Sequence, residues 1–207
     1  MWARGTRRAV GITGQAAREL AGMAGLPADV RRFYVRAILT AIRRRDRWSL
    51  ASATRPSDLA CLLRLARGRL QTVELGTGTG WTSISLALAD PRRRVVTYDP
   101  HDHTGRESYF ALVDPAVRDR IELRRRSGER GPEAGESVEF LFLDSSHARE
   151  ETLASFRAWQ DAVVPDGLVA FHDYGHASYG GVREAIDELG LRGDIRGALF
   201  AWRKART

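Results

Sequence analysis

The sequence predicts an α/β fold in which a mainly parallel, doubly wound sheet carries helices on both faces. The first observation behind this prediction is that short apolar or β-branched runs alternate with helical stretches from Gln71 onward. Such alternation favours parallel strands, because the chain must cross a face of the sheet between them. The second is that acids, histidines and glycines follow several predicted strands, at the edge where such sheets bind ligands. The 207 residues, of which 43% are hydrophobic, are enough for one domain with a full core.

The individual elements are predicted from apolar runs that are bounded by turn residues. The predicted strands are 71–75, 94–98, 121–125, 138–143, 167–171 and 198–202. The predicted helices in this region are 82–89, 109–113, 115–118, 150–163 and 182–189. The run 138–143 is strongly apolar, so we expect it near the centre of the sheet.

The part of the chain before the sheet is predicted to be helical. Apolar residues recur at three- and four-residue spacing over 27–48, with arginines on the other faces, as in an amphipathic helix. Residues 49–55 are predicted to be a break, and a second helix starts at Pro56. We therefore divide the chain into an N-terminal helical extension or lid (1–55) and a main domain (56–207). The helix over 27–48 either covers the substrate pocket or packs on a second subunit, which makes a homodimer the expected assembly.

Composition and charge exclude several classes of protein. The sequence has no run of about 18 apolar residues, which argues against a membrane span, and its first residues lack the apolar segment of a secretory signal. A single cysteine, Cys61, excludes an internal disulfide, and we expect a cytoplasmic protein. The net charge of +7 would suit nucleic acid. However, every basic residue except Lys204 is arginine and asparagine is absent, as in GC-rich coding sequences, so we disfavour a nucleic-acid partner.

The segment V-E-L-G-T-G-T-G-W-T-S (73–83) joins the first predicted strand to a helix. Its glycines, Gly76, Gly78 and Gly80, are spaced G-x-G-x-G, whereas a nicotinamide dinucleotide fingerprint is spaced G-x-G-x-x-G. By itself the loop allows a tight turn or a ligand at the start of the helix. Asp99 ends the next predicted strand, where a carboxylate can accept hydrogen bonds from ribose hydroxyls.

Four ordered motifs resemble the class I S-adenosylmethionine-dependent methyltransferases. They are V-E-L-G-T-G-T-G, V-V-T-Y-D-P, F-L-F-L-D and V-P-D-G-L-V-A-F-H-D. The resemblance covers about residues 71–204. The W-T-S, D-S-S-H and G-L-V-A-F-H-D-Y segments are most similar to small-molecule O-methyltransferases of the sugar and catechol types in natural-product pathways. This resemblance implies a Rossmann-like seven-stranded sheet with a sixth strand near 191–195 and an antiparallel last strand, so that 56–207 would be the methyltransferase domain.

The resemblance also implies which residues bind the cofactor S-adenosylmethionine. They are Glu74, Gly76, Thr77, Gly78, Gly80, Asp99, Ser127, Gly128 and Asp144. The glycine loop would approach the methionine portion, and Glu74 would orient that loop or meet the amino group. Asp99 would hold the ribose, the segment 127–128 would flank the adenine, and Asp144 would lie beside the sulfonium methyl group.

A divalent metal ion, Mg²⁺ or Mn²⁺, is a further implication of the resemblance. The residues that correspond to the metal ligands of metal-dependent members are Asp144, His172 and Asp173. A metal there would lower the pKa of the acceptor hydroxyl. The chain departs from the pattern, because His172 replaces an acid and Ser146 stands where a second acid resembles a catalytic base. His147 could be the base instead. We therefore take Asp144, His147 and His172 as candidate catalytic residues and leave the metal open.

Three alternatives to methyl transfer to a small-molecule hydroxyl stay open. An RNA methyltransferase would explain the charge, but Asp144-Ser-Ser-His147 lacks the proline and the aromatic residue of the [N/D]-P-P-[Y/F] motif that stacks a flipped base. A non-catalytic cofactor-binding or partner-binding relative would explain the missing second acid. A nicotinamide oxidoreductase is weakened by the glycine spacing.

Overall fold

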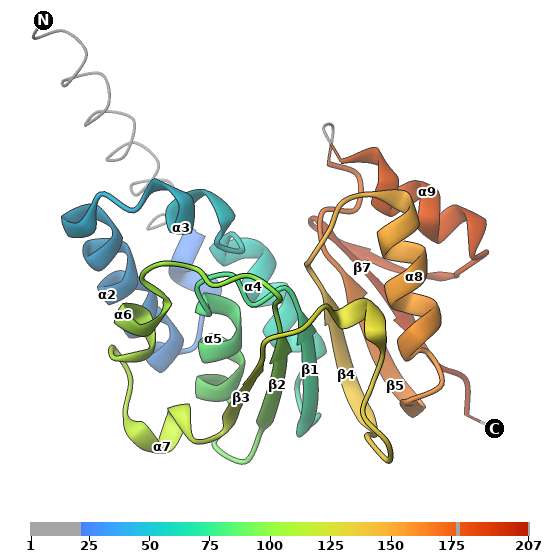
Figure 1. Cartoon of the computed structure of the whole chain (residues 1–207), viewed down its shortest axis with the longest axis horizontal. Helices are drawn as coiled ribbons and strands as arrows, with labels where there is room; N and C mark the ends of the chain where they lie inside the picture. Colours follow the sequence, from blue (N-terminus) through green and yellow to red (C-terminus); the bar gives the residue numbers. More distant parts are fainter. Residues whose placement is uncertain (1–21, 177–178, 207) are drawn as a thin grey trace, which may run out of the picture.

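The computed structural model describes residues 22–176 and 179–206 and contains a seven-stranded sheet in the order β3-β2-β1-β4-β5-β7-β6 (Figure 1). The strands are β1 (Gln71–Leu75), β2 (Arg94–Tyr98), β3 (Ile121–Arg124), β4 (Val138–Leu143), β5 (Val163–Phe171), β6 (Gly193–Arg196) and β7 (Leu199–Arg203). The first five strands are parallel, and β7 runs antiparallel to both β5 and β6. The predicted sheet, its antiparallel last strand and the central place of β4 are confirmed.

Helices cover both faces of the sheet, as predicted (Figure 1). One layer contains α2 (Ala28–Arg44), α4 (Pro56–Leu65) and α5 (Trp81–Ala89), and the other contains α8 (Arg149–Trp159) and α9 (Gly180–Glu188). On β4, Phe140 and Phe142 belong to the core of the first layer, whereas Leu141 and Leu143 belong to that of the second. This alternation is that of a strand buried on both faces. The connections carry α3 (Arg47–Ser52), α6 (Arg106–Phe110), α7 (Pro115–Arg118), η1 (Gly22–Gly25) and η2 (Gly128–Arg130).

The helix predicted over 27–48 is interrupted. Arg45 adopts a left-handed backbone with φ of 57°, and α3 begins directly after Asp46. The Asp46 carboxylate caps α3 by accepting hydrogen bonds from the backbone N–H (2.9 Å) and hydroxyl (2.6 Å) of Ser49, and it also accepts one from the Tyr109 hydroxyl (2.7 Å). The break therefore comes earlier than predicted, and α3 occupies the first part of the segment that was expected to be irregular. The first 21 residues of the predicted extension lie outside the described residues.

The apolar stripe of α2 is buried within the chain. Tyr34 meets Trp81 of α5 edge to face, with ring centroids 5.2 Å apart, and its hydroxyl donates to the Thr54 carbonyl (2.6 Å). Phe33 contacts the same Trp81 ring with a centroid distance of 6.4 Å. Leu39 is the large apolar side chain of α2 that stays exposed. The stripe that suggested a second subunit is thus used by α5, and the extension shares one hydrophobic core with the sheet.

Some element bounds differ from the prediction by a few residues. β5 begins at Val163 rather than at residue 167, because Val163 pairs with Val138 ahead of a shift in register at which β5 carries the extra residues. The edge strand β6 is Gly193–Arg196, and all its residues are exposed.

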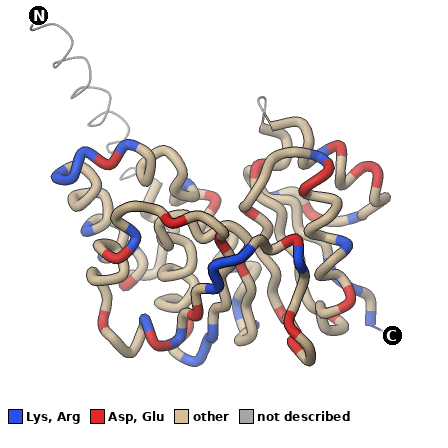
Figure 2. The backbone as a smooth tube through the Cα atoms, viewed as in Figure 1, with Lys and Arg blue, Asp and Glu red and all other residues tan. Residues whose placement is uncertain are grey.

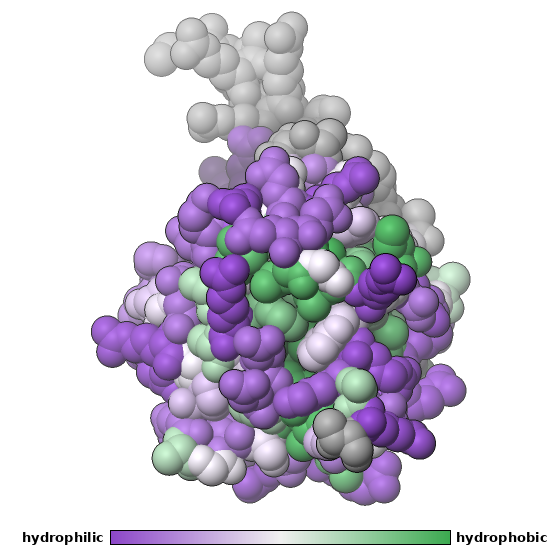
Figure 3. Space-filling view, turned by 90° about the vertical axis from the view of Figure 1, so that its right-hand side faces the viewer, coloured by the Kyte–Doolittle hydropathy of each residue, from purple (hydrophilic) through white to green (hydrophobic). Residues whose placement is uncertain are grey.

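Figure 3 views the molecule from the side of α8 and α9 and shows a hydrophobic strip enclosed by hydrophilic side chains. Among the described residues, no helix combines the length and the apolar character that a membrane crossing requires.

Candidate active site

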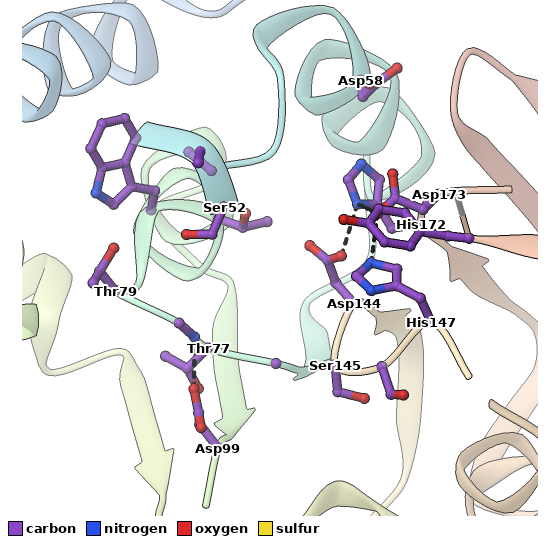
Figure 4. Close-up of a pocket in the computed structure, with 18 of the residues that line it drawn as sticks. Ser52, Asp58, Thr77, Thr79, Asp99, Asp144, Ser145, His147, His172 and Asp173 are labelled. Carbon is purple, nitrogen blue, oxygen red and sulfur yellow. Dashed lines mark hydrogen bonds and ion pairs between the residues drawn. The ribbon is translucent and has the colours of Figure 1, made fainter. Parts of the chain in front are cut away.

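A cavity of about 1120 Å³ opens where β1, β2, β4 and β5 end. It is lined by most of the predicted site residues, which are Gly76, Thr77, Gly78, Asp99, Ser127, Gly128, Asp144, His147, His172 and Asp173. Figure 4 shows two groups among them, with Thr77 and Asp99 at one end and the two histidines with Asp144 and Asp173 at the other. The predicted residues Glu74 and Gly80 do not line it. The carboxyl ends of parallel strands therefore bring the candidate chemistry together, as the fold predicts.

The three glycines of the loop all have positive φ angles, of 105° at Gly76, 52° at Gly78 and 87° at Gly80. A Cβ on Gly76 would lie 2.3 Å from the carbonyl oxygen of Asp144, and one on Gly80 would lie 2.3 Å from the ring of Phe110. These two glycines are therefore required by packing within the chain. Gly76 and Gly78 line the cavity and Gly80 does not, and the prediction that the loop brings its backbone close to the cofactor stays a prediction.

Glu74 is buried beneath the loop and 1% exposed. Its Oε2 accepts hydrogen bonds from the hydroxyls of Ser83 on α5 and Thr97 on β2, while Oε1 has no partner among the described residues. Burial raises the pKa of Glu74 to about 8, despite the hydrogen bonds from these hydroxyls. Of the two predicted roles, orienting the loop agrees with this geometry. Contact with the cofactor's amino group does not, because the carboxyl points into the core.

Asp99 is held by four donors. Its Oδ2 accepts from the Gly78 N–H (2.8 Å) and from Arg106 (3.1 Å), and lies 3.1 Å from His103 Nε2. Its Oδ1 accepts from the N–H of His101 (2.8 Å). Arg106 is 3% exposed and also donates through Nε to the Gly78 carbonyl (2.7 Å), so one buried guanidinium joins the acid to the loop. No sequence motif pointed to this arginine, which follows the strand by several residues on a separate helix.

The segment that was expected to flank the adenine is fixed from the opposite layer. Ser127 caps η2 by accepting a hydrogen bond from the N–H of Glu129 (3.3 Å). The carbonyl of Gly128 accepts a hydrogen bond from Trp159 Nε1 on α8 (2.6 Å). A Cβ on Gly128 would lie 2.7 Å from a methyl carbon of Leu75, so this glycine lets the segment approach the end of β1.

Asp144 and His172 form an ion pair at the other end of the cavity. His172 Nδ1 lies 2.8 Å from Asp144 Oδ1. Burial alone would lower the pKa of His172, but the charge and hydrogen bond of Asp144, together with Asp173 and Asp58, raise it to about 9. His172 is thus protonated at neutral pH. The hydroxyl of Thr54 reaches the second Asp144 oxygen at 3.5 Å, so the N-terminal extension also contributes to this site.

His147 and Asp173 form the second pair. His147 Nε2 lies 2.6 Å from Asp173 Oδ2. Burial would raise the pKa of Asp173, but the hydrogen bond from His147 and the charge of His172 hold it below the ordinary value. The His147 ring stacks on Tyr179 at 4.0 Å, and His176 stacks on Tyr179 at 4.4 Å. The base candidate is therefore fixed by a carboxylate on its edge and an aromatic ring on its face.

The residues that could hold a metal ion are not quite those that were predicted. One ligand atom each of Asp144, His147 and Asp173 lie within 4.8 Å of one another. His147 stands in this group in place of the predicted His172, whose Nδ1 lies 2.8 Å from Asp144 Oδ1. Two carboxylates and one imidazole fit a divalent cation such as Mn²⁺.

Two further residues at the site come from parts of the chain where no motif pointed to function. Trp48 of α3 lines the cavity against Gly78, and the buried Thr54 lies beside Asp144. Both belong to the segment predicted as the end of a helix and a break. No local signal could have found them, because long-range packing of the extension on α5 carries them to the site.

The chain was then compared with known proteins. Residues 73–174 match a family described as a methyltransferase domain, while no curated protein matches the chain. The solved structure of CalS11, described as a TDP-rhamnose 3′-O-methyltransferase of calicheamicin biosynthesis, is 15% identical over 98% of this chain and 95% of its own, with a TM-score of 0.59. TomG from Streptomyces achromogenes, an O-methyltransferase of tomaymycin synthesis solved with S-adenosylmethionine, is 21% identical over 81% and 87%, with a TM-score of 0.56.

A third similar structure is described as a putative rRNA methylase from Clostridium thermocellum. It is 16% identical over 73% of this chain and 100% of its own, with a TM-score of 0.53. At these identities the structural likenesses establish the fold. The family match spans the segment that carries the glycine loop, Asp99, Asp144 and Asp173. The match over 73–174 and the strand order together show a methyltransferase domain with the seven-stranded sheet that the resemblance to class I S-adenosylmethionine-dependent methyltransferases implies.

Proposed function

We propose that the chain transfers the methyl group of S-adenosylmethionine to a hydroxyl oxygen of a small-molecule acceptor. The observation that carries this proposal is the His147–Asp173 pair, at 2.6 Å, in the same cavity as Asp99 and the glycine loop. An imidazole that is oriented by a carboxylate is the arrangement of a general base. CalS11 and TomG, both described as O-methyltransferases, support transfer to oxygen.

The cofactor would occupy the cavity between the glycine loop and Asp144. When bound, S-adenosylmethionine supplies a methyl group on a positively charged sulfur, so the protein needs only to position the acceptor and remove its proton. Asp99 would accept hydrogen bonds from the ribose hydroxyls, and the segment 127–128 would flank the adenine. The carboxylate of Asp144 would face the sulfonium, while His172 balances its charge.

Removal of the acceptor proton is assigned to His147. One ring nitrogen is hydrogen-bonded to Asp173, which leaves the other nitrogen for the proton of the acceptor hydroxyl. Asp173 would hold the ring in place and stabilise the imidazolium that forms. Tyr179, stacked on the same ring, would restrict its rotation.

Assistance by a divalent cation is the second route, and Asp144, His147 and Asp173 would hold the ion. Mg²⁺ or Mn²⁺ bound there would lower the pKa of the acceptor hydroxyl. The routes are distinguishable, because His147 is a base in the first and a ligand in the second. Methyl transfer that survives EDTA supports the first route, and transfer that is lost with EDTA and restored by Mn²⁺ supports the second.

RNA is the alternative acceptor, because one similar structure is described as a putative rRNA methylase. Lys and Arg residues lie in several separate stretches in Figure 2, interspersed with acidic residues, which favours a small molecule over a polyanion. The division into a lid (1–55) and a methyltransferase domain (56–207) and the cytoplasmic location remain part of the proposal. A homodimer through 27–48 also remains part of it, but it would have to use the exposed face of this segment, because the apolar stripe packs on α5. Light scattering of the purified chain would test the dimer.

The proposal is tested with S-adenosylhomocysteine and a panel of hydroxylated acceptors. We expect calorimetric binding of S-adenosylhomocysteine near neutral pH, and transfer of radioactive methyl to at least one phenol or sugar but not to RNA. The His147→Ala variant should bind S-adenosylhomocysteine normally and lose transfer. No binding by the parent chain would refute the cofactor, and full transfer by His147→Ala would refute the base.

A further inference from the structure

Two aromatic side chains at the cofactor end of the cavity have no role in the proposed reaction. Trp48 of α3 and His103 of the loop after β2 stack with ring centroids 4.3 Å apart and an interplanar angle of 22°. Both line the cavity. Trp48 is 48% exposed although it is one of the largest apolar side chains.

Trp48 lies directly on the glycine loop. A Cβ built on Gly78 would be 3.3 Å from Cη2 of the Trp48 ring. The indole therefore rests against the backbone of the loop on the side where Gly78 lacks a side chain. Because α3 belongs to the N-terminal extension, the extension reaches the loop that is expected to hold the cofactor.

The bonds of Asp99 show what the stacked pair blocks. A carboxylate offers about four lone-pair positions. Three of the four donors converge on Oδ2, namely the N–H of Gly78 and the side chains of Arg106 and His103, whereas Oδ1 accepts from the N–H of His101. The two adjacent ribose hydroxyls can each bond one carboxylate oxygen, and Oδ1 has a lone pair left for one of them. Oδ2 has no position for the other hydroxyl unless one of its three donors leaves.

The four donors differ in how easily they can leave. The N–H groups of Gly78 and His101 are backbone groups next to the acid. Arg106 is 3% exposed and is tied by further bonds to the carbonyls of Gly78 and His101. The side chain of His103 is 21% exposed, and apart from Asp99 it makes ring contacts with Trp48 and His101. Of the four donors, His103 is therefore the one held by the fewest and weakest other interactions.

We propose that His103 holds the place on Asp99 that the cofactor's ribose takes, and that Trp48 moves with it as part of the cofactor site. This inference rests on the proposed function, which puts a ribose at Asp99. On binding, the ribose hydroxyl replaces His103 Nε2 as donor, and the Trp48–His103 stack separates. His103 and Trp48 are therefore residues that set cofactor affinity, although neither belongs to a recognised motif.

The first test is calorimetric binding of S-adenosylhomocysteine to the parent chain, His103→Ala and His103→Gln. The alanine variant frees one position on Asp99 and should bind about three to ten times more tightly, which is the net worth of one hydrogen bond. The glutamine variant keeps an N–H donor of similar reach and should bind like the parent. Equal or weaker binding by His103→Ala would overturn the inference, while binding by the parent would still support the proposed function.

The second test asks whether the gain depends on the ribose hydroxyls. The comparison uses the 2′,3′-dideoxy form of S-adenosylhomocysteine, which lacks the donors that would replace His103. The advantage of His103→Ala should vanish with this ligand, and an advantage that persists would point to a general loosening of the loop and overturn the inference. Absence of binding by the parent chain to S-adenosylhomocysteine would overturn both the inference and the proposed function.

Tryptophan fluorescence tests whether Trp48 moves when the ligand binds. Five tryptophans contribute to the emission, so the signal of Trp48 is obtained by difference from Trp48→Phe. Because Trp81 also lines the cavity, Trp48→Phe can keep part of the response, so saturation with S-adenosylhomocysteine should change the emission of the parent clearly more than that of Trp48→Phe. Trp202→Phe, in which a distant tryptophan on β7 is altered, serves as the control that keeps the response. A parent emission that does not respond to bound ligand would contradict the movement of Trp48.

Discussion

Replacement of Glu74 by glutamine should change how the stability of the fold depends on pH. Burial raises the pKa of Glu74 from an ordinary value of 4.5 to about 8. Because the folded state binds this proton more tightly than the unfolded state, the contribution of Glu74 is complete below pH 4.5 and is lost as pH rises toward 8. At about 1.4 kcal/mol per pH unit, the change between pH 5 and pH 8 amounts to roughly 4 kcal/mol. Glutamine does not titrate and removes this loss.

The assay is urea unfolding of the parent and of Glu74→Gln at four pH values from 5 to 8. The parent should lose about 4 kcal/mol more than the variant over this range. At pH 5 the variant should be the less stable of the two by about 1–3 kcal/mol, because its amide places an N–H where Oε1 has no partner. Glu122→Gln, which alters an exposed carboxyl, should follow the parent. Parallel curves for the parent and Glu74→Gln would refute the reasoning, since they would mean that Glu74 titrates normally.

The remaining predictions concern packing and the two ends of the site. Gly76→Ala should lower the free energy of unfolding, measured by urea titration, by about 3 kcal/mol, because its Cβ would lie 2.3 Å from the Asp144 carbonyl oxygen. The control is Gly68→Ala, which also has a positive φ but has open space around the added Cβ, and it should lower the free energy of unfolding by only about 1 kcal/mol. His172→Gln should be less stable than the parent at pH 6, and the difference in stability should shrink as pH rises through 9. The reason is that the His172 ring, whose pKa is raised in the fold, stabilises the folded state only while it is protonated. A difference in melting temperature that does not vary with pH would contradict this. Thr54→Val should lower methyl transfer several-fold and leave calorimetric S-adenosylhomocysteine binding unchanged, because its hydroxyl reaches Asp144 rather than Asp99; equal loss of both would contradict it.

The positions of the site residues along the chain could be predicted because strand ends are a local property of the sequence. Asp99, Asp144 and Asp173 each follow directly or closely after an apolar run, and parallel pairing brings the ends of β2, β4 and β5 to one edge. The start of α3 was also visible, because Asp46 followed three residues later by Ser49 is a capping pattern. It was overlooked because the apolar spacing continues through the break.

Other features depend on packing between distant segments and leave no local signal. The direction of the Glu74 side chain is set by its neighbours, since Val73 and Leu75 belong to the core of the α8 layer and Glu74 must therefore face α5. The presence of His147 rather than His172 in the candidate metal group depends on distances that only the folded chain shows. Trp48 reaches the cavity, and Thr54 reaches Asp144, because the extension packs on α5.

The shared core of the extension and α5 limits how the acceptor specificity of this chain can be changed. If the extension covers the acceptor, exchanging it for that of another methyltransferase is the obvious way to redirect the enzyme. A grafted extension would not pack correctly on α5, because Tyr34 and Phe33 of this extension pack against Trp81, the first residue of the helix that follows the glycine loop. A mismatch there would shift the start of α5 and, with it, the loop. Extension and helix therefore have to be exchanged as one unit, and specificity and cofactor binding are inherited together.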